Sequence, residues 1–92
     1  MGFIKDAKAA QAGADAQKAY TAGHYIFAAR LNWPATHHAM SGEVADWSQQ
    51  IEAIERAGWA LAEWAVGQDK QGRPEAYPVF KRRREQAARA PQ

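Results

Sequence analysis

The segment from Val44 to Arg82 constrains the fold of this 92-residue chain most, because it joins one helix-type pattern to two strand-type patterns. Its first part has apolar residues spaced three, four and three apart, which places them on one stripe of an amphipathic helix. They are Val44, Trp47, Ile51 and Ile54. Ser41 is expected to cap this helix, with Glu43 and Asp46 in the first turn, where the macrodipole favours negative charge. Gly58 is expected to end it.

Two strands joined by a tight hairpin are predicted after Gly58. The first is Trp59–Val66, with its odd-numbered residues on one face and its even-numbered residues on the other. Gly67–Gly72 is rich in turn-forming residues, and Pro74–Arg82 returns as the second strand. Its two prolines lack the N–H that a strand ladder needs, which favours an edge position or a bulge. We therefore expect Pro74–Arg82 to be the edge and contact strand of the sheet.

A helix and a strand are also predicted before this segment. Phe3–Ala22 has a loose helical stripe made mostly of alanine, weakened by Gly13 and stopped by Gly23. Because an alanine stripe buries little area, this helix is expected to pack separately or against a neighbouring subunit. His24–Leu31 alternates with a period of two and is expected to end before Asn32-Trp33-Pro34, since proline cannot continue a strand ladder.

The element order predicts an α+β fold with two layers. A three-stranded sheet has one covering helix and is preceded by the Ala-rich N-terminal helix. If the Trp47 helix bridges the first two strands, these strands run parallel through a right-handed crossover. The expected organisation is an N-terminal helix over residues 1–23, a β-α-β-β domain over residues 24–82 and a basic C-terminal tail over residues 83–92.

Three stretches of the chain carry a resemblance to a known family. They are Tyr25-Ile26-Phe27, Ile51-Glu52-Ala53-Ile54-Glu55-Arg56-Ala57-Gly58-Trp59 and Tyr77-Pro78-Val79-Phe80-Lys81-Arg82. Over residues 24–82 the chain resembles the DUF4177-type small proteins of unknown function. The resemblance implies a structural motif in which a glycine ends the helix and a tryptophan begins the next strand. It also implies a bacterial protein, and it transfers no catalytic residue.

Length and composition exclude several classes of protein. A chain of 92 residues forms one domain with a thin core. The absence of cysteine excludes disulfides, thiolate metal sites and cysteine nucleophiles, and fits a cytoplasmic protein. No stretch is long and apolar enough to suggest a transmembrane segment or a signal peptide. Residues 81–92 hold five Lys/Arg and one Glu, a net charge of +4, whereas residues 1–80 carry −2.

No pattern in the chain indicates an enzyme or a cofactor. His37 and His38, with His24, form the only histidine set, and adjacent histidines rarely share one ion, so a polar loop is favoured over a metal site. Ser41 and Ser48 lack a nucleophile framework. We therefore expect a non-catalytic protein without a metal or cofactor.

The surplus of aromatic side chains over what so small a core can hold favours self-association, so we expect a homo-oligomer formed through a sheet edge or an aromatic sheet face. The expected interface residues are Trp33, Trp64, Tyr77 and Phe80. Another protein is a further candidate partner, and a small-ligand pocket between the sheet and the Trp47 helix is a third hypothesis.

The basic run Lys81-Arg82-Arg83-Arg84 has three interpretations. It can be a solvated strand end, since charge runs usually are. It can supply phosphate contacts for weak, salt-sensitive binding of nucleic acid. It can also pair with an acidic surface of another subunit, such as that of Glu52 and Glu55.

Overall fold

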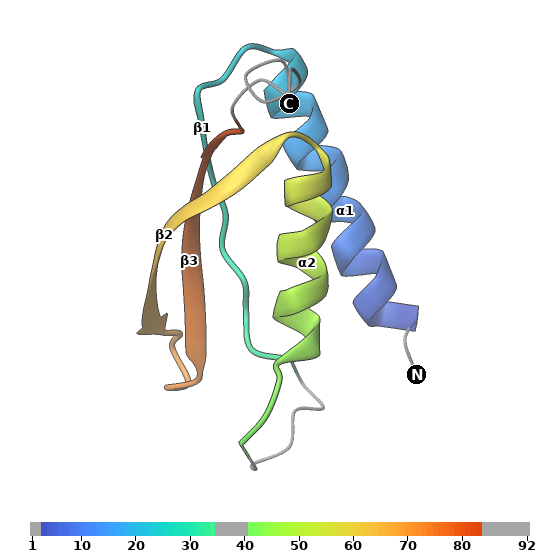
Figure 1. Cartoon of the computed structure of the whole chain (residues 1–92). Coiled ribbons are helices and arrows are strands. Elements are labelled where there is room, and N and C mark those ends of the chain that lie inside the picture. The colour runs from blue at the N-terminus through green and yellow to red at the C-terminus, as the bar shows by residue number, and fades with distance from the viewer. Residues whose placement is uncertain (1–2, 35–40, 84–92) are drawn as a thin grey trace.

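The computed structural model describes residues 3–34 and 41–83, with side chains described from residue 7 onward. Two helices and three strands follow one another along the chain (Figure 1). They are α1 (Phe3–Thr21), β1 (Ile26–Ala28), α2 (Ala45–Arg56), β2 (Trp59–Gln68) and β3 (Pro74–Arg82). The predicted α+β class, the three-stranded sheet and the preceding N-terminal helix are confirmed.

The sheet has the order β1-β3-β2, and both pairings are antiparallel. β1 and β2 therefore run parallel, as the crossover predicted, but β3 lies between them. The prediction that Pro74–Arg82 is the edge strand is wrong, because it is the central strand. The long free edge of the sheet belongs to β2.

Pro78 fits a central strand because the backbone N–H that it lacks would face β1 and not the long strand β2. Its carbonyl accepts the N–H of Ala29 at 3.0 Å, so the bond lost is the reciprocal one to Ala29. β1 ends as a regular strand at Ala28, one residue before this gap. The pairing then resumes where Leu31 and Ala76 exchange two backbone bonds of 2.8 and 3.0 Å.

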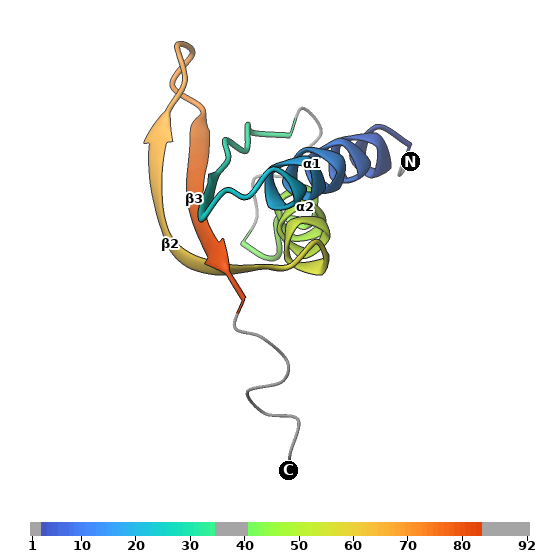
Figure 2. The ribbon, with the colours of Figure 1, turned by 90° about the horizontal axis from the view of Figure 1, so that it is seen from above.

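Both helices lie on one face of the sheet, so the molecule has two layers (Figure 2). α1 packs along α2, where Gly13 comes so close that an added Cβ would lie 3.4 Å from that of Ala53. The prediction of a separately packed N-terminal helix is wrong, because two of its alanines are buried in the same core as the sheet. The buried members of this core are Ala16, Ala19, Ile54, Trp59 and Phe80.

The second helix follows its predicted stripe but begins later than predicted. Ser41 does not cap it; Val44 occupies the N-cap position without a side-chain bond. Asp46 lies in the first turn, as predicted, and accepts a 2.8 Å bond from Lys8 Nζ of α1. At the other end Gly58 follows the C-cap with φ of 111°, a conformation that favours glycine.

A β-bulge reverses the faces of β2 beyond Leu61. Leu61 lies opposite Phe80, but Glu63 lies opposite Val79, so Ala62 is an extra residue in the strand. Trp64 consequently faces the helices with Leu61 and not, as predicted, with the even-numbered residues that precede the bulge. The one-residue insertion shifts the alternation for the rest of the strand.

Candidate functional site

The free edge of β2 offers unpaired backbone groups over residues 64–68. The backbone groups of Ala76 and Pro78 form hydrogen bonds toward β1. Because backbone groups alternate in direction along a strand, the odd-numbered residues of β3 point theirs toward β2. Their partners in β2 use their N–H and C=O groups in this ladder. By alternation, Trp64, Val66 and Gln68 direct their N–H and C=O groups to the edge that has no strand partner in the described sheet.

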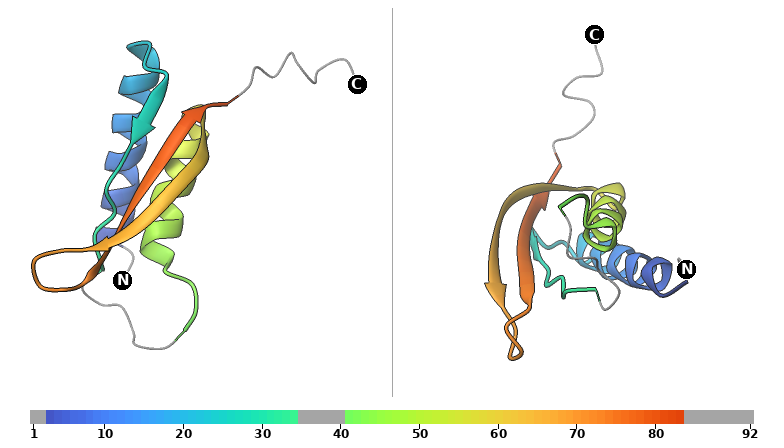
Figure 3. Two further views of the ribbon diagram at one scale, coloured as in Figure 1. Left: turned by 90° about the vertical axis from the view of Figure 1, so that its left-hand side faces the viewer. Right: turned by 90° about the horizontal axis from the view of Figure 1, so that it is seen from below.

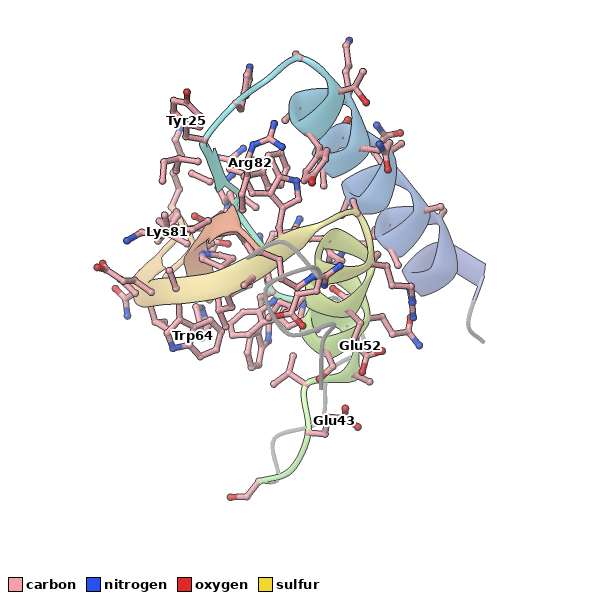
Figure 4. All side chains as sticks on the ribbon, turned by 45° about the horizontal axis from the view of Figure 1, so that its top comes forward. Tyr25, Glu43, Glu52, Trp64, Lys81 and Arg82 are labelled. Atoms are coloured by element: carbon pink, nitrogen blue, oxygen red, sulfur yellow. The ribbon has the colours of Figure 1, made fainter. Side chains whose placement is uncertain are left out.

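The same stretch exposes large apolar side chains on the face that the helices cover elsewhere. Val66 is 57% exposed, Trp64 49% and Leu61 40%. In Figure 4, Trp64 lies beside the ribbon of β2, and its ring meets that of Trp47 edge-on with centroids 6.0 Å apart. The indole is therefore packed against Trp47 on one side, and about half of the Trp64 side chain remains accessible.

Curvature of the β2–β3 hairpin leaves this surface uncovered. β2 starts beside the C-terminal end of α2 and then bends away from both helices toward the hairpin tip (Figure 2; Figure 3, right). The bulge at Ala62 is the sequence-encoded cause, since bulges bend and twist the strand that carries them. We name the accessible apolar side chains and the adjoining free backbone, residues 61–68, the β2 edge surface.

A tryptophan chain anchors the β2 edge surface to the core. Trp47 packs edge-on against both Trp64 and Trp33, with the Trp33 ring centroid at 5.7 Å. The indole N–H of Trp47 donates to the carbonyl of Asn32 at 2.8 Å, which fixes its ring. The position of Trp64 is thus set by a buried residue of α2.

The four predicted interface residues do not form one surface. Trp33 is half-buried against Trp47, and Trp64 belongs to the β2 edge surface. Tyr77 lies on the opposite face of the sheet, opposite Ala65. Phe80 is 0% exposed in the core, so its prediction as a contact residue is wrong: the central position of β3 places it beneath the helices.

The interface prediction from sequence omitted Leu61 and Val66. The signal that could have found them is the spacing of the large apolar residues in β2, which is two, three and two. A step of three within a strand indicates a β-bulge. The extra residue of the bulge brings the apolar residues that follow it onto the same face as those that precede it. They are Trp59, Leu61, Trp64 and Val66.

Tyr77 is held by local contacts on the outer sheet face. Its hydroxyl donates to Glu75 Oε1 at 2.6 Å, and its ring lies where a Cβ on Gly67 would come within 3.1 Å. The hydrogen bond to Glu75 raises the pKa of Tyr77 above its ordinary value.

Arg82 is a structural residue rather than a free cation. Its Nε donates to the carbonyl of His24 and its Nη2 to that of Tyr20, both at 2.6 Å. Its guanidinium carbon lies 4.0 Å from the centroid of the Tyr20 ring and 5.5 Å from that of Trp59. Arg82 therefore binds the C-terminal end of α1, where the helix dipole favours a cation.

The other members of the basic run have separate environments. Arg83 Nη1 donates to the carbonyl of Glu55 at 2.8 Å, at the C-terminal end of α2. Lys81 is exposed and points away from the helices, on the side opposite to Arg82 (Figure 4). Arg84 lies outside the described residues. Two consecutive arginines thus bind the C-terminal ends of the two helices.

The hairpin tip is ordered by Asp69. Its Oδ1 accepts the backbone N–H groups of Arg73 and Gln71, both at 2.9 Å, and its Oδ2 accepts Nε of Arg73 at 2.9 Å. The backbone bond from Arg73, with its guanidinium and the Gln71 bond, holds the pKa of Asp69 below its usual value. The free edge of β2 thus ends in a fixed turn.

The described residues contain no group of three or more potential metal ligands. His24 is exposed, while His37 and His38 lie outside the described ranges. A shallow hollow is lined by Glu52, Glu55, Arg56 and Arg83, with two charges of each sign. Three of these residues belong to α2 and Arg83 directly follows β3, so the hollow lies beside the C-terminal half of α2. No helix in the described parts of the chain is long and apolar enough to cross a membrane.

Comparisons with protein-family models, curated proteins and solved structures found no match to this chain. The resemblance to DUF4177-type proteins therefore stays a prediction. What the geometry establishes is a small α+β fold with an accessible apolar surface next to an unpaired strand edge.

Proposed function

We propose that this protein is a non-catalytic assembly module that forms homo-oligomers through the β2 edge surface. The observation that carries the proposal is the coincidence of free backbone groups with exposed Trp64 and Val66 on the same stretch of strand. Main-chain bonds along such an edge give affinity, and the apolar side chains beside them add burial.

The free stretch of this edge lacks two of the features that usually prevent sheet-to-sheet association, a charge and a proline. Natural edge strands carry charges, prolines or bulges, or are very short. β2 has ten residues, and its bulge and Glu63 precede the free stretch, so residues 64–68 read Trp-Ala-Val-Gly-Gln without a charge or a proline. A domain this small also has a thin core, and burial against a partner adds to its stability.

Nucleic-acid binding by Lys81-Arg82-Arg83-Arg84 has less support. Phosphate binding needs cations that are free to replace counterions. Arg82 and Arg83 already donate to carbonyls at the helix ends, whereas Lys81 faces the other side of the sheet. No second function is proposed from this run. A cytoplasmic location and a bacterial source are part of the proposal, supported by the cysteine-free composition and by the family resemblance.

Light scattering coupled to size exclusion tests the proposal. From low to high micromolar concentration, we expect the mass to rise above the 10.2 kDa of one chain. Val66→Lys should abolish the rise, because it places a charge in the β2 edge surface. Tyr25→Lys is the matched control: Tyr25 is 81% exposed near β1, so its replacement should leave association unchanged. A strict monomer at all concentrations would overturn the proposal.

A further inference from the structure

We infer that two copies of the chain pair through β2, antiparallel and about a two-fold axis at Val66, so that their sheets join into one six-stranded sheet. This inference rests on the proposed function and specifies its partner and its register. The partner is a second copy of the same strand.

The register follows from the positions of the free backbone groups. Trp64, Val66 and Gln68 point their N–H and C=O groups to the edge, and this set is symmetric about Val66. Pairing Val66 with the partner's Val66 places Trp64 opposite the partner's Gln68, and each such pair exchanges two hydrogen bonds. Every free group of the stretch is then satisfied.

Moving the two-fold axis by one residue, from Val66 to Ala65, leaves backbone groups unpaired. An axis at Ala65 pairs Trp64 with the partner's Val66 but sets Gln68 opposite the partner's Ala62, the extra residue of the bulge. Bulged residues interrupt a ladder. Near the bulge the N–H of Leu61 is also occupied, since it donates to Glu55 Oε2 at 3.3 Å. The free stretch is therefore bounded by the bulge and by the Asp69 turn.

Charge opposes self-pairing about Val66 only at the two ends of the paired stretch. No charged side chain lies between Trp64 and Gln68, so no like charges are opposed within the paired stretch. At its ends Glu63 comes opposite the partner's Asp69. That carboxylate is already bound by an arginine, with Arg73 Nε at 2.9 Å from Asp69 Oδ2.

The geometry also limits the assembly to two copies. An isologous pair uses the β2 edges of both copies and leaves only their β1 edges. β1 has three residues, and the gap at Pro78 follows directly after it. So short an edge is a poor template for further strands, so the assembly is a closed dimer and not a filament.

Single-cysteine cross-linking tests the register, because the natural chain has no cysteine. In the full-length chain, Val66→Cys places two thiols in a hydrogen-bonded pair, whose Cα atoms lie about 5.5 Å apart, within disulfide range. In the same register Ala65→Cys puts its thiols on diagonal positions at about 7–8 Å, beyond easy bridging. Ala28→Cys reports on the β1 edge. All three sites are exposed in the monomer, and circular dichroism checks that the fold is kept.

Under mild oxidation we expect Val66→Cys to give mostly disulfide-linked dimer and the other two variants to stay mostly monomeric on a non-reducing gel. Preferential linkage of Ala65→Cys would show the shifted register, and linkage of Ala28→Cys would show the β1 edge. Either result overturns the inference. If none links while light scattering reports a dimer that Val66→Lys abolishes, the register is wrong and the proposed function stands; if Val66→Lys leaves that dimer intact, both are overturned. If light scattering reports only monomer, both are overturned.

Discussion

Replacing Arg82 by Met should destabilise the fold strongly even though it removes one charge from a basic run. Methionine keeps an unbranched apolar side chain but loses both 2.6 Å bonds, to the carbonyls of Tyr20 and His24, together with the guanidinium that lies over the Tyr20 ring. These bonds hold the last turn of α1 to β3. Their loss frees the helix end that carries the buried Ala19.

The magnitude follows from the two bonds. A hydrogen bond with a charged donor contributes about 1.5–3 kcal/mol, and because Arg82 is only partly buried the lower end applies, giving about 3 kcal/mol for the pair. A 92-residue domain has a total stability of about 5–14 kcal/mol, so the loss is a large fraction. With a slope of about 1.5 kcal/mol per molar urea, the unfolding midpoint should fall by about 2 M.

Urea denaturation followed by tryptophan fluorescence measures this effect. Lys81→Met is the matched control, since it removes the neighbouring charge from an exposed side chain and should leave the midpoint almost unchanged. Arg82→Lys keeps the charge but lacks the planar fork, so it should restore less than half of the loss. If Arg82→Met and Lys81→Met behaved alike, the capping role of Arg82 would be refuted.

Two further predictions concern the folded chain. Gly58→Ala should cost more stability than Gly72→Ala: both glycines have positive φ, but a Cβ on Gly58 would lie 2.5 Å from the Tyr20 ring, while Gly72 has open space. We expect about 2 kcal/mol or more against about 1 kcal/mol, measured by urea unfolding, and equal losses would contradict the close packing. Glu75→Gln should lower the raised pKa of Tyr77 toward its ordinary value in an ultraviolet titration. Because the folded-state pKa is raised, the stability from this bond is present below the unfolded pKa of about 10 and is lost as pH rises through the folded one; an unchanged titration would count against the bond.

Features set by local sequence could be predicted. The Val44–Ile54 stripe, the stop at Gly58 and the end of α1 just before Gly23 depend on neighbours within one or two turns of the chain. The predicted α+β class followed from these elements and from the period-two strands. The expectation that Ser41 caps α2 was wrong only about the residue at which the helix begins.

Features set by contacts distant in sequence could not be predicted. The two prolines favoured an edge position or a bulge for Pro74–Arg82, but Pro78 is tolerated in the central strand because its missing donor faces the short β1. Likewise, the basic run gave no sign that Arg82 bonds to carbonyls 58 and 62 residues away. Of the expected interface, only Trp64 lies on the β2 edge surface, because the bulge at Ala62 decides which face it occupies.

Amide hydrogen exchange tests most directly whether the β2 edge surface is where copies of this chain meet. The edge N–H groups of Trp64, Val66 and Gln68 should exchange fast in dilute solution and gain protection at high micromolar concentration, whereas those of Ala65 and Gly67, already bonded within the sheet, should not change. Equal exchange of the three edge amides at both concentrations, in a sample that light scattering shows to be associated, would contradict the account.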